Sequence, residues 1–209
     1  MKIKKIYEDE DLLVIDKPAG IIVDYPLRIH RLDKNTSGVL LIAKNEKALI
    51  FFQKQFKKRE VEKKYIALVV GNVKNSQGRI ETLIGRSQKD RRKQKAYLSF
   101  EPGAKLKREA ITEYKVLERF DGYTLVEVLP KTGRKHQIRC HFAYLSYPIA
   151  GDKMYGFKNQ ACPQGLNRQF LHASYIKIKL FTGKYKELSS PLPQDLKICL
   201  DNLKKNSQK

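Results

Sequence analysis

The chain has 209 residues and a formal net charge of +21, from 43 lysines and arginines against 22 acidic residues. This length suits one compact domain, and 41% hydrophobic residues are sufficient for a buried core. Apolar runs are too short for a membrane span, and the charged N-terminus does not resemble a signal peptide. The three cysteines form no CxxC, so neither a disulfide framework nor a zinc site is indicated, as expected of a cytoplasmic protein.

The N-terminal part of the sequence predicts short strands separated by turns. Lys4–Glu8 and Leu12–Asp16 resemble two strands around an acidic turn, Lys17–Gly20 a turn, and Ile21–Val23 a further short strand. The apolar run Val39–Lys44 is long enough for a buried strand.

A helix and a central strand are expected next. Asn45 is a candidate N-cap for a helix that continues to about Lys57. Its apolar residues recur every four positions, at Ala48, Phe52 and Phe56. Lys63–Gly71 is apolar after its lysines, which is typical of a central strand. Strand signals then flank a charged loop centred on Asp90–Lys95.

The second half of the chain begins with a predicted hairpin. Ile111–Phe120 and Tyr123–Pro130 alternate in polarity around Asp121-Gly122, a dipeptide suited to tight turns. A helix is expected from near His136, because Ile138, Phe142 and Leu145 would share one face.

The C-terminal part predicts one strand and one helix. The strand is centred near Tyr175, Ile176 and Ile178, and a proline-containing turn leads into a last short helix. Residues 203–209 are expected to form a basic tail. The whole pattern predicts one α+β domain, rich in antiparallel sheet, over residues 1–202.

The positive charge favours a polyanionic partner, most often nucleic acid. Basic residues cluster beside apolar segments in Phe51–Tyr65 (FFQKQFKKREVEKKY) and in Gly85–Lys95 (GRSQKDRRKQK). A solvated, lysine-rich surface is the simpler alternative. A membrane surface is disfavoured, since no strongly amphipathic terminal helix is present.

Three groups of residues are candidates for chemistry. In His30-Arg31-x-Asp33, neighbouring arginine favours an ionised carboxylate that can act as nucleophile or general base, although a structural salt bridge is the alternative. Gly133–His141 (GRKHQIRCH) can hold phosphates or orient a carboxylate. Its His141 is expected to be a packing or hydrogen-bonding residue. Tyr65, beside lysines, can stack a base or lie in the core.

Several common motifs are missing from the sequence. No phosphate loop, dinucleotide fingerprint or HExxH motif occurs, and no set of ligands favours a metal. A metal-dependent nuclease using His30 and Asp33 is therefore disfavoured.

Five motifs carry a resemblance to a known family. The segments HRLDKNTSG, KKYIALVVG, TGRKHQIRCHF, PIAGDKMYG and FLHA occur in the order and approximate spacing of the RluA-type pseudouridine synthases. The opening IYEDEDLLVIDKPAGIIV is also similar to the start of that family, so the resemblance covers nearly the whole chain.

The resemblance implies an RNA isomerase that needs no cofactor and no metal. In this reaction the glycosidic bond of a uridine is broken, and the uracil turns and rejoins the sugar through carbon. The implied fold is a single catalytic domain on a mixed, mainly antiparallel sheet with flanking helices and an RNA-binding cleft. Asp33 matches the catalytic aspartate, and attack on the sugar, attack on the base and removal of a sugar proton all remain open roles for it.

The resemblance also implies roles for six further residues. The tyrosine that packs against the target base corresponds to Tyr65, and the arginine paired with the catalytic carboxylate to Arg139. Residues expected to bind substrate are Arg31, which helps to displace the nucleotide, Ile138 and Leu171, which line the uracil pocket, and His30.

Two departures from the family bear on the substrate. Only Ile21–Ile29 separate KPAG from HRLD, where relatives often have a much longer segment. The chain also leaves no room for the N-terminal S4 RNA-binding domain of many relatives. We therefore expect a monomer that binds a stem-loop of ribosomal or transfer RNA through the charge of its catalytic domain. A non-catalytic RNA-binding or ribosome-assembly factor on the same scaffold is the alternative.

Overall fold

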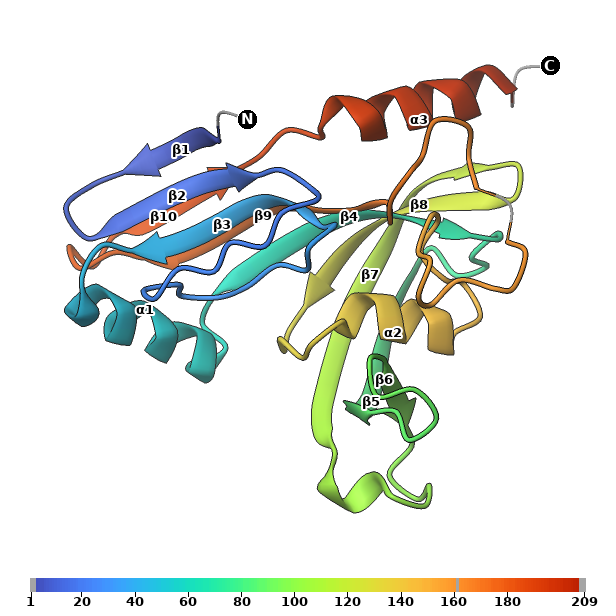
Figure 1. The fold of residues 1–209 in the computed structure, drawn as a ribbon, viewed down its shortest axis with the longest axis horizontal. Helices are drawn as coiled ribbons and strands as arrows, with labels where there is room; N and C mark the ends of the chain where they lie inside the picture. The colour runs from blue at the N-terminus through green and yellow to red at the C-terminus, as the bar shows by residue number, and fades with distance from the viewer. Residues whose placement is uncertain (1–2, 161, 207–209) are drawn as a thin grey trace. The chain divides into compact units, whose positions relative to one another are not determined.

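The computed structural model of the protein describes residues 3–160 and 162–206 (Figure 1). These residues form ten strands, three α-helices and one short 3-10 helix. Contacts divide the chain into two compact units, Met1–Tyr65 with His172–Pro193, and Ile66–Leu171 with Gln194–Lys209. Strands β4 (Glu62–Val70) and β9 (Leu171–Lys179) contribute residues to both units.

The first unit contains a mixed sheet. Besides β9 it includes β1 (Lys4–Glu8), β2 (Leu12–Lys17), β3 (Ser37–Ala43) and β10 (Tyr185–Ser189). Neighbouring strands β1, β2 and β3 are antiparallel, β3 runs parallel to the start of β9, and β10 is antiparallel to the rest of β9. Every residue of β3 is buried, which confirms the predicted buried strand.

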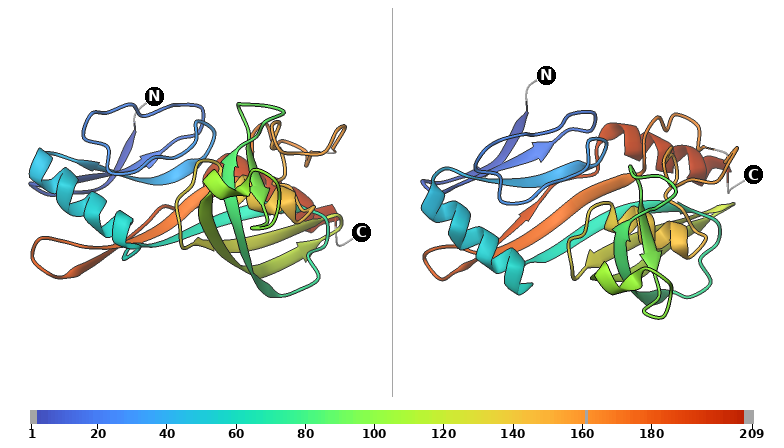
Figure 2. Two further views of the ribbon diagram at one scale, coloured as in Figure 1. Left: turned by 90° about the horizontal axis from the view of Figure 1, so that it is seen from below. Right: turned by 60° about the horizontal axis from the view of Figure 1, so that its bottom comes forward.

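Helix α1 (Glu46–Lys58) packs against the sheet of the first unit, as Figure 2 shows from two directions. The side chain of Asn45 accepts a hydrogen bond from the backbone N–H of Ala48 at 2.8 Å, which confirms the predicted N-cap. Ala48 and Phe52 then join a core cluster with apolar residues of β2, β3 and β9. This packing covers one face of the sheet.

The second unit contains an antiparallel sheet and two helices. Its strands are β5 (Gln77–Arg86), β6 (Gln94–Tyr97), β7 (Arg108–Phe120) and β8 (Tyr123–Pro130), in the order β8-β7-β5-β6. The turn between β7 and β8 is the predicted Asp121-Gly122, where Gly122 has a φ of +70°. Helix α2 (Gln137–Tyr144) packs against β6, β7 and β8, and a 3-10 helix (Ala104–Leu106) precedes β7.

Two expectations about local structure are wrong. Residues Ile21–Val23 form no strand, and the carbonyl of Ile21 accepts a hydrogen bond from the Lys17 ammonium in place of a strand partner. Helix α3 (Gln194–Asn206) is not short, because it has 13 residues, as many as α1. It includes residues 203–206 of the expected tail, and residues 207–209 lie outside the described residues.

Apolar spacing explains the length of α3. Leu196, Cys199 and Leu203 are buried, and they recur at the three- and four-residue intervals that place side chains on one helical face. The predicted α+β class with a mixed, mainly antiparallel sheet is confirmed, whereas the expected RNA-binding cleft stays a prediction. Among the residues described, no helix is long and apolar enough to cross a membrane.

The close approach of β3 to β9 yields a first prediction about stability. Gly38 pairs with Ala173, has a φ of +117°, and a Cβ added there would lie 2.1 Å from the carbonyl oxygen of Ala173. Gly38→Ala is expected to lower the free energy of unfolding by about 2–5 kcal/mol, because backbone strain and overpacking add. Urea unfolding measures the change.

Gly20→Ala is the matched control for this substitution. Gly20 also has a positive φ, +90°, but no atom lies within 4 Å of an added Cβ. Gly20→Ala is expected to lower the free energy of unfolding by about 1–2 kcal/mol, because only the strained backbone conformation contributes. Equal losses in the two variants would show that the contact with Ala173 does not constrain the strand.

Candidate active site

The loop that carries Asp33 is fastened to the end of β2 by a buried lysine. Lys17 is only 1% exposed, and its Nζ donates to the carbonyl oxygens of Pro18 at 2.9 Å, Ile21 at 3.0 Å and Lys34 at 3.1 Å. The backbone N–H of Gly20 also donates to the Lys34 carbonyl. Burying an ammonium is costly unless acceptors surround it, so these carbonyls fix both ends of the loop at one point.

Within this loop, consecutive residues differ in exposure. Arg31 is exposed, Leu32 is buried and Asp33 is half-buried. Arg31 forms no hydrogen bond or ion pair with any residue in the described part of the chain, so its guanidinium is available to a ligand. The backbone N–H of Thr36 donates to the carbonyl of Asp33 at 3.0 Å, which closes a turn directly before β3.

The structure brings Tyr65 and Asp33 together in the first unit. Tyr65 packs against the cluster that contains Leu32, Leu40 and Ala173. Burial raises the pKa of its phenol, and the negative charge of Asp33 raises that pKa further. Tyr65 is therefore protonated at neutral pH and offers an uncharged aromatic ring beside the carboxylate.

The imidazole of His30 is held by other residues of the same unit. Its Nε2 accepts a hydrogen bond from the backbone N–H of Leu41 at 3.1 Å, and its ring stacks on Phe56 with centroids 4.9 Å apart. Burial lowers the pKa of His30 to about 3, and the charge of Lys63 contributes. His30 is thus neutral and fixes the start of the Asp33 loop against β3, while its role in binding substrate stays a prediction.

A buried histidine joins β3 to β9 at the other end of this loop. His172 Nδ1 lies 2.9 Å from the Ser37 hydroxyl, and Nε2 lies 3.0 Å from the carbonyl oxygen of Ser190. Because a carbonyl only accepts, Nε2 donates to Ser190, while Nδ1 shares a hydrogen bond with the Ser37 hydroxyl. The Ser190 hydroxyl in turn donates to Asp16 at 2.8 Å.

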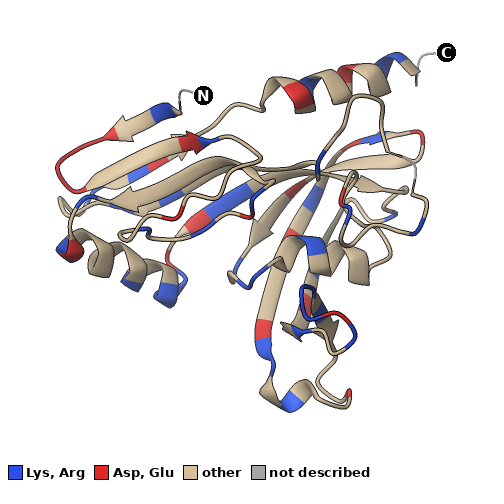
Figure 3. Ribbon diagram, viewed as in Figure 1, with Lys and Arg blue, Asp and Glu red and all other residues tan. Residues whose placement is uncertain are grey.

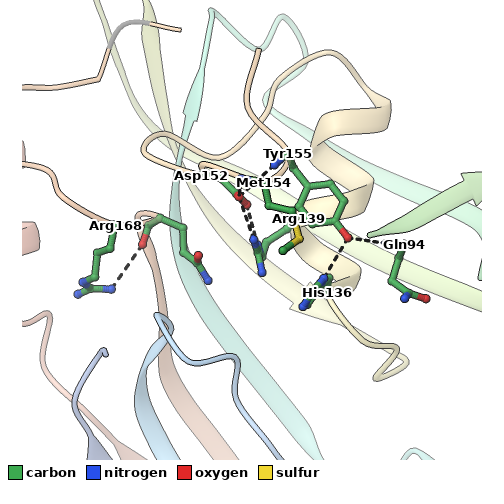
Figure 4. Close-up of polar contacts among 8 residues, drawn as sticks. Gln94, His136, Arg139, Asp152, Met154, Tyr155 and Arg168 are labelled. Atoms are coloured by element: carbon green, nitrogen blue, oxygen red, sulfur yellow. Dashed lines mark hydrogen bonds and ion pairs between the residues drawn. The ribbon is translucent and has the colours of Figure 1, made fainter. Parts of the chain in front are cut away.

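Arg139 lies on α2, in the second unit, in a two-pronged ion pair with Asp152 (Figure 4). Its Nε and Nη2 donate to the two carboxylate oxygens at 2.6 Å and 2.9 Å, and both side chains are buried. Asp152 also accepts the backbone N–H groups of Met154 and Tyr155. Arg139 and Asp33 belong to different units, and their pairing stays a prediction.

Tyr155 connects Arg139 to two other elements of the second unit. Its ring centroid lies 5.0 Å from the Arg139 guanidinium. Its hydroxyl accepts from the backbone N–H of Gln94 at 2.7 Å and lies 3.0 Å from His136 Nδ1 (Figure 4). The segment after α2 therefore fixes the start of that helix to β6.

Polar side chains anchor the buried face of α2. His141 Nδ1 and Nε2 lie 2.8 Å and 3.1 Å from the hydroxyls of Thr112 and Thr82. Burial lowers the pKa of His141 to about 4, so it is neutral, and the predicted hydrogen-bonding role is confirmed. Ile138 and Leu171 are also buried in this unit, and their role in a uracil pocket stays a prediction.

Three supporting residues were missed by the sequence analysis. Lys17 lies in KPAG, which was interpreted only as a turn, and Asp152 and Tyr155 lie in GDKMYG, which was interpreted only as a loop. The signal that could have identified Lys17 is a charged residue at the end of an apolar strand. The signal that could have identified Asp152 is a lone acidic residue near a strongly basic segment. Residues 3–160 and 162–206 contain no group of three or more His, Cys, Asp or Glu placed to hold a metal ion.

Comparisons with known proteins agree with this arrangement. The family described as RNA pseudouridylate synthase matches residues 23–144. An uncharacterized RNA pseudouridine synthase of Bacillus subtilis is 35% identical, over 96% of this chain and 72% of its own length. The ribosomal large subunit pseudouridine synthase D of Borreliella burgdorferi is 34% identical, over 97% of this chain and 69% of its own.

Solved structures extend the likeness to the fold. The human RNA pseudouridylate synthase domain containing 1 superposes with a TM-score of 0.82 at 29% identity, covering 99% of this chain and 95% of the human one. The human domain containing 4 gives a TM-score of 0.81 at 26% identity, covering 96% and 93%. With these matches over nearly its whole length, the chain belongs to the RluA-type RNA pseudouridine synthases, isomerases that act on RNA.

Proposed function

We propose that Asp33 is the essential catalytic group of this pseudouridine synthase and that its substrate is a uridine in structured RNA. The observation that carries the proposal is the packing of Tyr65 against the cluster that contains Leu32, the neighbour of Asp33 in the loop held by Lys17. A carboxylate in that position can act as a nucleophile or as a base. The proposal includes attack on the sugar, attack on the base and removal of a sugar proton as alternative first steps.

Tyr65 supports the proposal because a base cannot be isomerised inside a stack. Extracting a nucleotide costs a few kcal/mol, and stacking on an aromatic ring returns about 1–3 kcal/mol per base. Arg31, exposed two residues before Asp33, is placed to take part in this displacement. Arg139, fixed by Asp152, is proposed to pair with Asp33 when the site is assembled.

The distribution of charge supports binding of RNA through phosphates. Figure 3 shows Lys and Arg on α1 and on the loop between β5 and β6. Lys57, Lys58 and Arg59 are exposed at the end of α1, and Arg91 and Arg92 are exposed in that loop. Each phosphate neutralised by such residues adds affinity that weakens as the salt concentration rises.

Ribosomal RNA of the large subunit is the first substrate to test, with transfer RNA as the alternative. Relatives from Borreliella burgdorferi and Vibrio vulnificus are named large subunit pseudouridine synthases. We also propose that the protein acts as a monomer in the cytoplasm. All the site residues lie on one chain, and its three cysteines are free, which supports a reducing compartment.

The first prediction for this function concerns Asp33→Asn. The substitution is nearly isosteric, but the amide cannot act as a carboxylate nucleophile or base. Pseudouridine formation on a large-subunit ribosomal RNA transcript should be abolished. RNA affinity should be unchanged or slightly tighter, because one negative charge is removed. Mass spectrometry measures product, and filter binding at fixed salt measures affinity.

Asp24→Asn is the matched control, since Asp24 is an exposed carboxylate of the same loop that pairs with Arg28. It should leave product formation intact. Product at the wild-type rate from Asp33→Asn would exclude Asp33 as the essential group. If Asp33→Asn loses both RNA binding and product formation, Asp33 is instead a structural carboxylate in an RNA-binding protein.

The second prediction concerns the ring of Tyr65. Tyr65→Leu should lower turnover by about ten- to a hundredfold, since about 1–3 kcal/mol of base stacking is lost. RNA affinity should change by far less, because phosphate contacts dominate it. Tyr65→Phe keeps the ring and should retain turnover if the hydroxyl is dispensable.

The control for Tyr65 is Tyr185→Leu, at an exposed tyrosine of β10 in the same unit. It should leave turnover unchanged. If Tyr65→Leu lowers the melting temperature and turnover only in proportion to the unfolded fraction, Tyr65 is a core residue and not a base contact.

A further inference from the structure

Lys63 of β4 is a half-buried cation that forms no ion pair with an acidic residue in the described part of the chain. It precedes Tyr65 by two residues. We propose that Lys63 binds a phosphate of the substrate RNA, adjoining the nucleotide whose base contacts Tyr65. This inference rests on the proposed role of Tyr65 and assigns the charged part of the same nucleotide to a further residue.

Strand geometry places Lys63 beside Tyr65. Alternate residues of a strand lie on one face, about 6–7 Å apart, and the intervening residue points to the other face. Lys64 is that intervening residue. Its Nζ lies 3.8 Å from Glu62 and 5.3 Å from the ring centroid of Tyr175, so its charge is already balanced.

The surroundings of Lys63 are aromatic and neutral. Its Nζ lies 5.8 Å from the ring centroid of Phe56, which stacks on His30. His30 carries no charge at neutral pH, because its pKa is lowered to about 3. Within residues 3–160 and 162–206, Lys63 forms no hydrogen bond or ion pair.

An ammonium in such surroundings is poorly compensated. Burial lowers the pKa of Lys63 to about 8, so the charged form is disfavoured relative to a lysine in water. A phosphate oxygen would supply a charge-assisted hydrogen bond and favour the charged form again. Because every nucleotide brings its own phosphate, a base held at Tyr65 delivers the missing anion to this face of β4.

Binding to an oligouridylate tests the proposal without knowledge of the natural target. Three variants are compared with wild type: Lys63→Met, Lys63→Arg and the matched control Lys64→Met. Affinity is measured by fluorescence anisotropy over a series of salt concentrations. Lys63→Met should bind about tenfold more weakly at low salt, since a hydrogen bond between charged groups is lost. The slope of log affinity against log salt should fall by about 0.7, the value of one single-strand phosphate contact.

The other two variants separate charge from position. Lys63→Arg should keep the wild-type slope, because the guanidinium also binds phosphate. Lys64→Met should change the affinity for oligouridylate by less than about twofold, because Lys64 is already paired with Glu62 and contributes little to RNA binding. The melting temperature of Lys63→Met should not fall, because an uncompensated half-buried charge is removed.

Several outcomes would overturn the proposal. An unchanged slope in Lys63→Met, or an equal fall in Lys64→Met, excludes a specific phosphate contact at Lys63. A lower melting temperature with an unchanged slope identifies Lys63 as a packing residue. Loss of turnover with unchanged oligouridylate affinity identifies a role in the chemistry. The slope does not depend on catalysis, so product formation by Asp33→Asn would overturn the proposed function without affecting this test.

Discussion

The buried ammonium of Lys17 is the constraint on which the active-site loop depends. Between β2 and β3 the chain forms no long regular element, although Leu27 and Ile29 form backbone hydrogen bonds with β3. One cation bound by the carbonyls of Pro18, Ile21 and Lys34 holds the rest of the loop. Without these carbonyls the buried ammonium would lose its acceptors, so the conformation of the loop and the burial of Lys17 depend on one another.

The same loop is closed at its far end by polar contacts of another kind. Ser37 begins β3 and shares a hydrogen bond with Nδ1 of His172 in β9, whose Nε2 donates to the Ser190 carbonyl. Gly38 follows at once and allows β3 to approach the backbone of Ala173 more closely than any side chain permits. Asp33 therefore lies between two rigid attachments, which is the kind of support that a positioned catalytic group requires.

Two carboxylates of this basic protein have different environments and, we infer, different uses. The side chain of Asp152 is fully buried and accepts hydrogen bonds from Arg139 and two backbone N–H groups, so it orients the arginine. Asp33 is half-buried, and its negative charge helps to keep the phenol of Tyr65 protonated. Hydrogen bonds, and not apolar packing alone, also hold helix α2, which carries Arg139. Gln137 and His141 of this helix both bond to the hydroxyl of Thr112.

Local patterns and motifs were enough to predict most elements and the family. Alternating and four-residue apolar patterns, the Asn45 cap and the Asp121-Gly122 turn are local signals, so β3, α1 and the β7–β8 hairpin could be predicted from them. Motif order pointed to Asp33 and Tyr65. Ile21–Val23 was predicted wrongly as a strand. A run of three apolar residues does not show whether its carbonyls will accept hydrogen bonds from a neighbouring strand or from a lysine.

Which charged groups compensate one another depends on contacts between segments that are distant in the sequence. Lys17 and Lys63 are both lysines on strands. The ammonium of Lys17 binds three carbonyls, whereas that of Lys63 lies over the ring of Phe56 and pairs with no acid among the described residues. The partner of Arg139 within its unit, Asp152, lies thirteen residues further along the chain. Such pairings depend on where the backbone places distant segments, and since a charge interacts through space rather than along the sequence, no local pattern records them.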